Sequence, residues 1–387
     1  MLALYDQAAA CSDATALAQL TTELTARAGM GPLWSDGRAL FATAAPLAVA
    51  GAFNAWSTTA AITAPLCGTG PVIVVTPVAT GLSPYKLVDG GGNWSLDPGN
   101  PAFAYDDFAG NPDGRNSAID TPDSGVGHLV SFGQECSTAL GNCREVTAYL
   151  PPAYDAPASA AVTYPVMFMH DGQNIWDDNT CCFGNGGWQV NLTLDSEIAA
   201  NKVAPVIVIG AANTANRNNE YGLDPTTTAA FEAFQIDTIQ PDALARVRGD
   251  GGKVVIGGSS LGGLIAMQGG LARPDVYRGI ASLSGAFWPT TFDGTELVDQ
   301  MPAMGKQPLA IYLDHGGEDS DNGDGAADSD AVVSELVTLG WQETTSPSCA
   351  APGASALCFY WEPGATHDEL AWRARVWRML EFMFPAD

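Results

Sequence analysis

Apolar residues follow a strand–helix alternation through the last two thirds of the chain. From residue 128 onward, short apolar runs are separated by longer stretches with helical character. The runs predict strands at His128–Glu135, Arg144–Leu150, Val166–His170, Val203–Ile209, Lys253–Gly257, Gly279–Ser284 and Pro308–Asp314. The longer stretches predict helices at Val190–Asn201, Thr227–Arg248, Ser260–Ala272, Asp330–Leu339 and Glu369–Phe384. This alternation predicts an α/β domain over 128–387, with a mostly parallel sheet covered by helices on both faces.

The first third of the chain has a different pattern. Residues 4–28 contain no Gly or Pro and are rich in Ala, Leu, Gln and Glu, so 1–30 is expected to be a leading helical segment. Over 31–110, short β-type runs such as Val72–Val78 and Tyr85–Val88 are broken by Gly, Pro and Asn, which predicts a small β-sandwich. Pro, Gly, Asp and Asn are dense over 98–124, and 111–127 is expected to be the linker.

Composition and charge exclude several classes of partner. Apolar residues make up 46% of the chain and charged residues only 15%, so intrinsic disorder is disfavoured. The formal charge of −27 repels phosphate backbones and anionic lipid surfaces. No apolar run approaches the roughly 20 residues of a membrane span. We therefore expect neither nucleic acid nor a membrane as partner. The sequence makes no prediction of the oligomeric state.

Eight cysteines occur without a CxxC or Cys/His zinc pattern, which disfavours a metal site. Several bracket short loops, as disulfides of exported proteins do, and we expect a secreted or extracytoplasmic protein although no signal peptide is visible. The predicted pairs are Cys11–Cys67, Cys136–Cys143 and Cys349–Cys358, which leaves the adjacent Cys181 and Cys182 to pair with each other. Buried free thiols are the alternative.

The sharpest motif is Gly258-x-Ser260-x-Gly262, which follows an apolar strand and opens a helical stretch. Glycines two before and two after a serine permit the strained strand–helix turn of a nucleophile elbow, which exposes the hydroxyl above the sheet. The following residue, Leu261, begins the helix, and its backbone N–H is one expected oxyanion donor. Ser259 is out of register with the glycines.

A serine nucleophile needs a base and an acid. With this elbow the chain order is serine, acid, histidine, which leaves His315 and His367 as candidates. His367 lies in a loop between a strand and the last helix and is the expected base, whereas His315 belongs to the loop of the acid. Four carboxylates compete in residues 314–321, and spacing alone does not choose among them. The acidic stretch through Asp328 also has some likeness to a calcium loop, a minority interpretation beside a solvated acidic loop.

The strand within Tyr164–Asn174 ends in a Gly-containing loop. A loop at that strand end provides the second oxyanion N–H in hydrolases with a nucleophile elbow, so Gln173 or Gly172 is the expected donor. His170 precedes the loop and is expected to support it.

Four motifs in order resemble the putative esterase family, which includes enterochelin esterases, feruloyl esterases and mycolyltransferases. They are Tyr164–Asn174, Pro205–Tyr221 with its Arg217, Gly258–Gly263 and His367-x-Glu369. The resemblance implies an α/β-hydrolase fold with a Ser–acid–His triad. By position it implies Ser260 as nucleophile, His367 as base and Asp319 as acid, with Glu318 and Asp321 as alternatives.

The N-terminal part is similar to the early-set β-sandwich of glycogen-binding modules, through Val49–Ser57, Tyr85–Gly90 and Asn93–Pro98. The resemblance implies that candidate sugar-contacting residues are Trp56, Lys86, Trp94 and Asn116. Indole faces stack on pyranose rings, but the same residues can build the core of a sandwich.

Together these features predict a secreted serine carboxylic-ester hydrolase that needs no cofactor and no metal. Its substrate is expected to be a feruloyl-type or other bulky ester, a small molecule or linked to a polysaccharide. Candidate substrate-binding residues are Trp176, Trp188, Trp288 and Arg217. The alternatives are an enterochelin esterase, an acyltransferase to sugar hydroxyls, and a carbohydrate-binding protein with an inert hydrolase domain.

Overall fold

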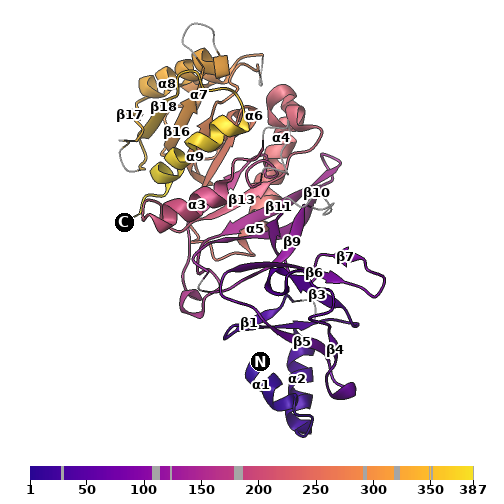
Figure 1. Ribbon diagram of the computed structural model, residues 1–387. Coiled ribbons are helices and arrows are strands. Elements are labelled where there is room, and N and C mark those ends of the chain that lie inside the picture. Colours follow the sequence, from indigo (N-terminus) through magenta and orange to yellow (C-terminus); the bar gives the residue numbers. More distant parts are fainter. Residues whose placement is uncertain are drawn as a thin grey trace. The chain divides into compact units, whose positions relative to one another are not determined.

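The computed structural model describes residues 1–27, 30–106, 114–122, 124–177, 186–290, 294–317, 323–347, 349 and 352–386. The chain divides into two compact units (Figure 1). The first contains Met1–Ser131 and Pro152–Ala160, and the second contains Phe132–Pro151 and Ala161–Asp387.

The second unit is built on a mostly parallel sheet in the order β17-β18-β16-β15-β14-β12-β13-β11. Neighbours pair in parallel from β17 to β13, whereas β11 is antiparallel to β13. Its strands are β11 (Asn142–Leu150), β12 (Val166–Met169), β13 (Ile207–Ala211), β14 (Val254–Ser259), β15 (Tyr277–Leu283), β16 (Ala310–His315), β17 (Gln342–Thr345) and β18 (Ala356–Trp361). Strands β12, β13 and β14 are buried along their whole length, as expected for strands covered on both faces.

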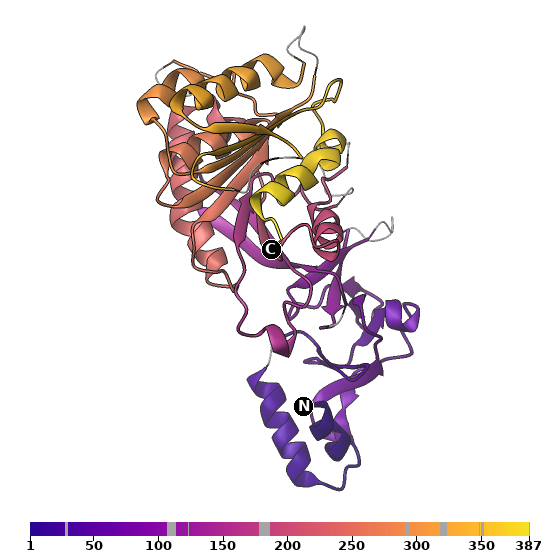
Figure 2. The same ribbon diagram turned by 90° about the vertical axis from the view of Figure 1, so that its left-hand side faces the viewer.

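Helices cover both faces of this sheet (Figure 2). Helices α3 (Val190–Ala199) and α9 (Glu369–Met383) lie together on one face. Helices α6 (Leu261–Ala272), α7 (Leu297–Met304) and α8 (Ala326–Leu339) lie on the other. The stretch predicted as one long helix is divided into α4 (Pro225–Phe234), a π-helical turn (Gln235–Ile239) and α5 (Gln240–Leu244).

In its described residues, the first unit contains two sets of antiparallel strands and the α-helices α1 and α2. One sheet has the order β1-β2-β5-β4, formed by β1 (Leu33–Ser35), β2 (Arg38–Ala42), β5 (Val72–Pro77) and β4 (Ala64–Pro65). The other contains β8 (Ala102–Tyr105), β9 (Arg115–Asp120), β6 (Leu82–Val88), β3 (Ala48–Gly51) and the short β7 (Trp94–Ser95). Phe41, Val49 and Tyr85 belong to the core that the sheets share. Helices α1 (Leu2–Ala8) and α2 (Ala14–Ala26) pack on the sheet that contains β2: Leu2 of α1 and Leu20 of α2 belong to one buried cluster with Leu40 of β2.

Most strands and helices expected from the apolar pattern are present, and the α/β fold class is confirmed. The linker expected over 111–127 is wrong, because Arg115–Asp120 forms β9 and pairs with both β6 and β8. Polar residues and glycines flank this short strand, so the apolar pattern did not predict it, although its centre, Asn116–Ile119, is buried. Strand β10 (His128–Ser137) also crosses the expected boundary at residue 128, since the first unit extends to Ser131.

The three disulfides expected from the loop-bracketing cysteines are present: Cys11–Cys67, Cys136–Cys143 and Cys349–Cys358. The first joins the turn between α1 and α2 to a 3-10 turn at Leu66–Gly68. Cys181 and Cys182 lie outside the described residues.

Candidate active site

Ser260 lies at the sharp turn between β14 and α6. Its backbone has φ 56° and ψ −128°, a region that L-residues rarely adopt, and its N–H donates to the carbonyls of Leu283 (3.1 Å) and Ser284 (3.2 Å). These bonds hold the turn against the end of β15. The backbone at Ser260 therefore has the strained geometry that the elbow motif predicts.

The glycines around Ser260 are required by close backbone approach. A Cβ on Gly258 would lie 2.7 Å from the carbonyl oxygen of Gly262, so strand and helix could not pack at this distance. A Cβ on Gly262 would lie 3.0 Å from the Asp171 carboxylate, which belongs to the loop after β12. The two glycines thus bring the helix against both its own strand and the neighbouring loop.

A cavity of about 520 Å³ opens beside Ser260. It is lined by Arg217, Asn218, Ser260, Leu261, Gly285, Ala286, Trp288, Asp324, Gly325, Asp328 and His367. These residues come from the loops that follow strands β13, β14, β15, β16 and β18, because the carboxyl ends of parallel strands meet at one edge of the sheet. The cavity contains a hydroxyl, an imidazole and carboxylates together.

His367 is paired with Asp324. The distance between His367 Nδ1 and Asp324 Oδ1 is 2.5 Å, and the side chain of Asp324 is 1% exposed whereas that of His367 is 40% exposed. Because Nδ1 is engaged, the Nε2 atom of His367 remains for other partners. The ring of His367 also packs edge-on against Trp372, with 5.1 Å between centroids. This arrangement can hold an imidazole in one tautomer and accept a proton at Nε2.

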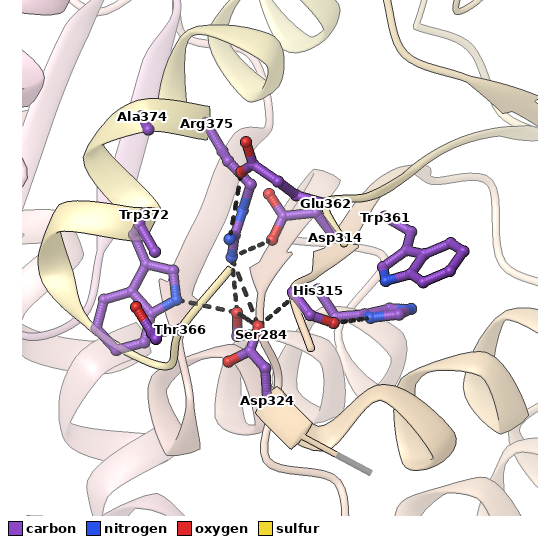
Figure 3. Close-up of polar contacts among 12 residues, drawn as sticks. Ser284, Asp314, His315, Asp324, Trp361, Glu362, Thr366, Trp372, Ala374 and Arg375 are labelled. Atoms are coloured by element: carbon purple, nitrogen blue, oxygen red, sulfur yellow. Dashed lines mark hydrogen bonds and ion pairs between the residues drawn. The ribbon is translucent and has the colours of Figure 1, made fainter. Parts of the chain in front are cut away.

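A buried hydrogen-bond network fixes Asp324 from behind (Figure 3). The Ser284 hydroxyl lies 2.6 Å from Asp324 Oδ2, and the Gly316 N–H donates to the same oxygen. The Ser284 hydroxyl oxygen in turn accepts from Trp372 Nε1 (3.0 Å) and Arg375 Nη2 (2.7 Å). Since both of those groups only donate, the single proton of Ser284 points to Asp324. Asp324 therefore accepts three hydrogen bonds and keeps one orientation.

Arg375 is shared between two buried carboxylates. Its Nη2 lies 3.2 Å from Asp314 Oδ1 and 3.8 Å from Asp324 Oδ2, and all three side chains are at most 1% exposed. Burial raises the pKa of the Asp314 carboxyl above its usual range, although Arg375 and the Tyr312 hydroxyl act in the opposite direction. One guanidinium thus compensates charge on both acids.

The loop after β12 lies behind the cavity: none of its described residues lines it, but Asp171 binds the lining residue Arg217. Asp171 accepts from Arg217 Nε and Nη2, both at 2.7 Å, and from the Asn213 side chain. The Gln173 side-chain oxygen accepts from the Asn213 backbone N–H at 2.9 Å. His170 is buried, and burial lowers its pKa to about 4, so it is neutral at physiological pH. His170 does not line the cavity, and its ring packs against Tyr221 and Phe231.

Two of the four candidate substrate-binding residues line the cavity. Arg217 and Trp288 do so, and Trp288 is 55% exposed. The interpretation of Trp176 and Trp188 as substrate-binding residues is wrong, because they are 1% and 2% exposed and lie in the core. Trp176 Nε1 donates to the Thr147 hydroxyl at 2.7 Å. Both indoles are large apolar groups, and they pack in the core behind the loops.

The candidate sugar-contacting residues divide in the same way. Trp56 and Trp94 lie near each other, with 6.3 Å between ring centroids, and Trp94 is 46% exposed. Lys86 and Asn116 are 5% and 1% exposed, so the expectation that they contact a sugar is wrong. Both lie at buried positions on strands, so their side chains are part of the interior of the first unit.

Sequence reasoning did not select Asp324, the residue that pairs with His367 at the cavity. The resemblance implied Asp319, with Glu318 and Asp321 as alternatives, and these three lie outside the described residues. Asp324 sits nine residues after the end of β16 in a left-handed conformation, φ 59°. Asp tolerates that conformation. The turn just before α8 is the one local feature of the sequence that could have pointed to Asp324. Ser284 and Arg375 carry no motif at all.

Within the described ranges, no three His, Cys, Asp or Glu side chains are placed to hold a metal ion, although part of the acidic loop lies outside these ranges. No helix in this part of the chain has the length and apolarity to cross a bilayer.

Comparison with known proteins yields one family. A family model described as putative esterase matches residues 137–383. An endo-1,4-beta-xylanase/feruloyl esterase from Xylanibacter ruminicola is 25% identical over 252 residues, which are 64% of this chain and 30% of that protein. An iron(III) enterobactin esterase from Dickeya dadantii is 29% identical over 186 residues, 47% of this chain and 39% of that protein.

The matched regions therefore span less than half of either relative. Among solved structures, a ferulic acid esterase superposes with a TM-score of 0.50 at 17% identity, covering 66% of this chain and 98% of that one. This likeness shows a shared fold.

Proposed function

Because this chain belongs to the putative esterase family, we propose that it is a serine hydrolase that cleaves carboxylic esters with Ser260, His367 and Asp324. The observation that carries the proposal is the cavity that both Ser260 and His367 line, while Asp324 holds Nδ1 of the imidazole. Asp324 takes the role that the sequence resemblance implied for Asp319.

The reaction starts with transfer of the Ser260 hydroxyl proton to Nε2 of His367 as the oxygen attacks the ester carbonyl. Asp324 accepts from Nδ1–H and stabilises the imidazolium that forms. The imidazolium then gives its proton to the alkoxide that leaves, and an acyl-enzyme remains. Water, deprotonated by His367 in the same way, attacks the acyl carbon; the bond to Ser260 Oγ then breaks, Oγ takes the proton back from the imidazolium, and the acid is released.

Two backbone N–H groups stabilise the negative oxygen of each tetrahedral intermediate. The N–H of Leu261 is the first, since the first N–H groups of a helix have no acceptor within it. The N–H of Gln173 is the proposed second donor, because the bond between its side chain and Asn213 fixes the loop that carries it.

The proposed substrates are feruloyl-type or other bulky esters, supported by the exposed Trp288 in the cavity and by the xylanase/feruloyl esterase relative. Siderophore esters, on the pattern of the enterobactin esterase relative, are the alternative acyl class. The three disulfides favour an oxidising compartment, so we propose that the protein is exported. The exposed Trp94, which lies near the half-buried Trp56, supports a weaker proposal, that the first unit contacts carbohydrate.

A fluorophosphonate probe tests the reaction directly. The probe is expected to label the protein at Ser260, and Ser260→Ala should abolish both labelling and hydrolysis while the melting temperature is kept. Ser259→Ala is the matched control, because it removes the neighbouring hydroxyl from the end of β14. A panel of feruloyl, acetyl and catecholate esters identifies the acyl class, and added sugar acceptors distinguish hydrolysis from acyl transfer. Unlabelled protein without activity on any ester would refute the proposal.

A further inference from the structure

The positive charge that lines the cavity is already compensated. Arg217 donates two hydrogen bonds to the carboxylate of Asp171, and its guanidinium lies 5.0 Å from the ring centroid of Tyr221. The Arg217 side chain is 17% exposed and that of Asp171 is 6% exposed, so this bidentate pair is largely shielded from water. The charge of Arg217 is therefore neutralised by Asp171, and the pair offers no net positive charge to an anionic substrate group.

One carboxylate of the cavity is not compensated. Asp324 is engaged by His367, Ser284 and Gly316 and is nearly inaccessible. Asp328, in the first turn of α8, lines the same cavity and is half-buried. Within the described part of the chain, its side chain has no hydrogen-bond or ion-pair partner. The uncompensated charge of the cavity is therefore negative, in a protein whose formal charge is −27.

The aromatic wall of the cavity strengthens the same preference. Trp288 lines the cavity with Asp328 and exposes 55% of its surface. An indole face attracts cations and has no corresponding attraction for anions. A free carboxylate and an exposed indole in one cavity of about 520 Å³ together favour a positively charged group.

We propose that Asp328 is a specificity-determining residue that makes the cavity prefer esters bearing a cationic group over neutral esters, and neutral esters over anionic ones. The proposal rests on the hydrolysis proposed above and concerns the charge of the group next to the scissile ester. It disfavours acyl or alcohol parts that carry carboxylate, sulfonate or ionised catechol.

Three acetate esters of similar size test the proposal: those of choline, of 3,3-dimethylbutanol and of 2-hydroxyethanesulfonate. The first is cationic, the second is its uncharged isostere and the third is anionic. The quantity measured is kcat/KM for each charged ester divided by kcat/KM for the neutral ester. Intrinsic reactivity cancels when this ratio is compared between wild type and variants.

Asp328→Asn is expected to lower the cationic-to-neutral ratio and to raise the anionic-to-neutral ratio, each by about three- to tenfold, the size of one charge interaction in a solvated site. Asp328→Lys should move both ratios further in the same directions, and both shifts should shrink at high salt. Glu335→Gln is the matched control, because Glu335 lies on the same helix but does not line the cavity. It should leave both ratios within twofold.

Unchanged ratios in Asp328→Asn and Asp328→Lys, with the neutral ester still hydrolysed, would overturn the role of Asp328 and leave the proposed hydrolysis standing. A wild-type preference for the anionic ester would also overturn it. If wild type hydrolysed none of the three esters and Ser260 took no fluorophosphonate label, the hydrolase proposal would fail and this inference with it.

Discussion

Replacing Asp324 by asparagine tests the identity of the acid with almost no change in volume. In the wild type, one carboxylate oxygen accepts from Ser284 and Gly316 and the other accepts from His367. An amide has one oxygen and one NH₂ group. Because Ser284 and Gly316 both donate, the amide oxygen must face them, and the NH₂ group must face Nδ1 of His367.

That orientation reverses the histidine tautomer. An NH₂ group donating to Nδ1 places the imidazole proton on Nε2, where it can no longer accept the proton of Ser260. The loss of charge also removes stabilisation of the imidazolium. We therefore expect Asp324→Asn to lower kcat by about 10³- to 10⁴-fold, the cost of the wrong tautomer in a Ser–His–Asp triad. KM should change little, since Asp324 is 1% exposed and hardly contacts substrate.

The assay is steady-state hydrolysis of a neutral phenyl ester, with the melting temperature as the folding control. Asp319→Asn is the matched comparison, because Asp319 is the acid that the sequence implied; it should retain activity within a few-fold of wild type. Retention of more than about a tenth of wild-type kcat by Asp324→Asn would refute the tautomer argument. A severe loss in Asp319→Asn instead would restore the assignment from sequence.

Three further predictions concern stability and the network. Ser284→Ala leaves buried donors without an acceptor, so it should cost about 1–3 kcal/mol of unfolding free energy by denaturant titration and also lower kcat, because Asp324 loses a donor; unchanged values would contradict the network. Burial raises the pKa of Glu232 to about 7, so the folded state binds the proton more tightly than the unfolded state and stability falls as pH rises from about 4.5 to 7. Glu232→Gln should therefore raise the melting temperature at pH 8 and leave it unchanged at pH 4; equal effects at both would argue against a raised pKa. Removing Cys11–Cys67, whose cysteines are 56 residues apart, by a double serine substitution should cost up to about 4 kcal/mol in thermal unfolding without affecting kcat.

Local backbone constraints explain which parts of the site could be predicted from the sequence. Ser260 was identifiable because the elbow needs glycine at two fixed neighbours, so the constraint is written within five consecutive residues. His367 followed from chain order and from its loop before α9. Asp324 was not selected, because its position depends on where the loop after β16 returns to the edge of the sheet. That is a tertiary constraint, and the sequence does not distinguish Asp324 from the other carboxylates nearby.

Burial was the other quantity that residue type did not reveal. Trp176 and Trp188 fall in loops near the site, as Trp288 does, yet only Trp288 remains exposed. The same holds in the first unit, where Lys86 is buried although its type and spacing suit a sugar contact. Whether a large or polar side chain faces a cavity or the core depends on neighbours that are distant in the chain, such as Thr147 beneath Trp176.

The parallel sheet explains how residues so far apart in sequence form one site. Ser260 follows β14, Ser284 follows β15, and Asp314 is the last residue of β16 that pairs with β15; the three strands are adjacent in that order. Adjacent strands are about 4.8 Å apart, so side chains at their carboxyl ends are already within one or two hydrogen bonds of each other. Arg375 from α9 bridges the remaining distance, because it contacts Asp314 and also Ser284, which in turn binds Asp324. Helix α9 also begins two residues after His367, so one helix positions both His367 and the guanidinium behind Asp324. A displacement of α9 along the sheet would therefore change both sides of the His367–Asp324 pair at once, and the geometry of that pair depends on the packing of α9 as much as on the loop that carries Asp324.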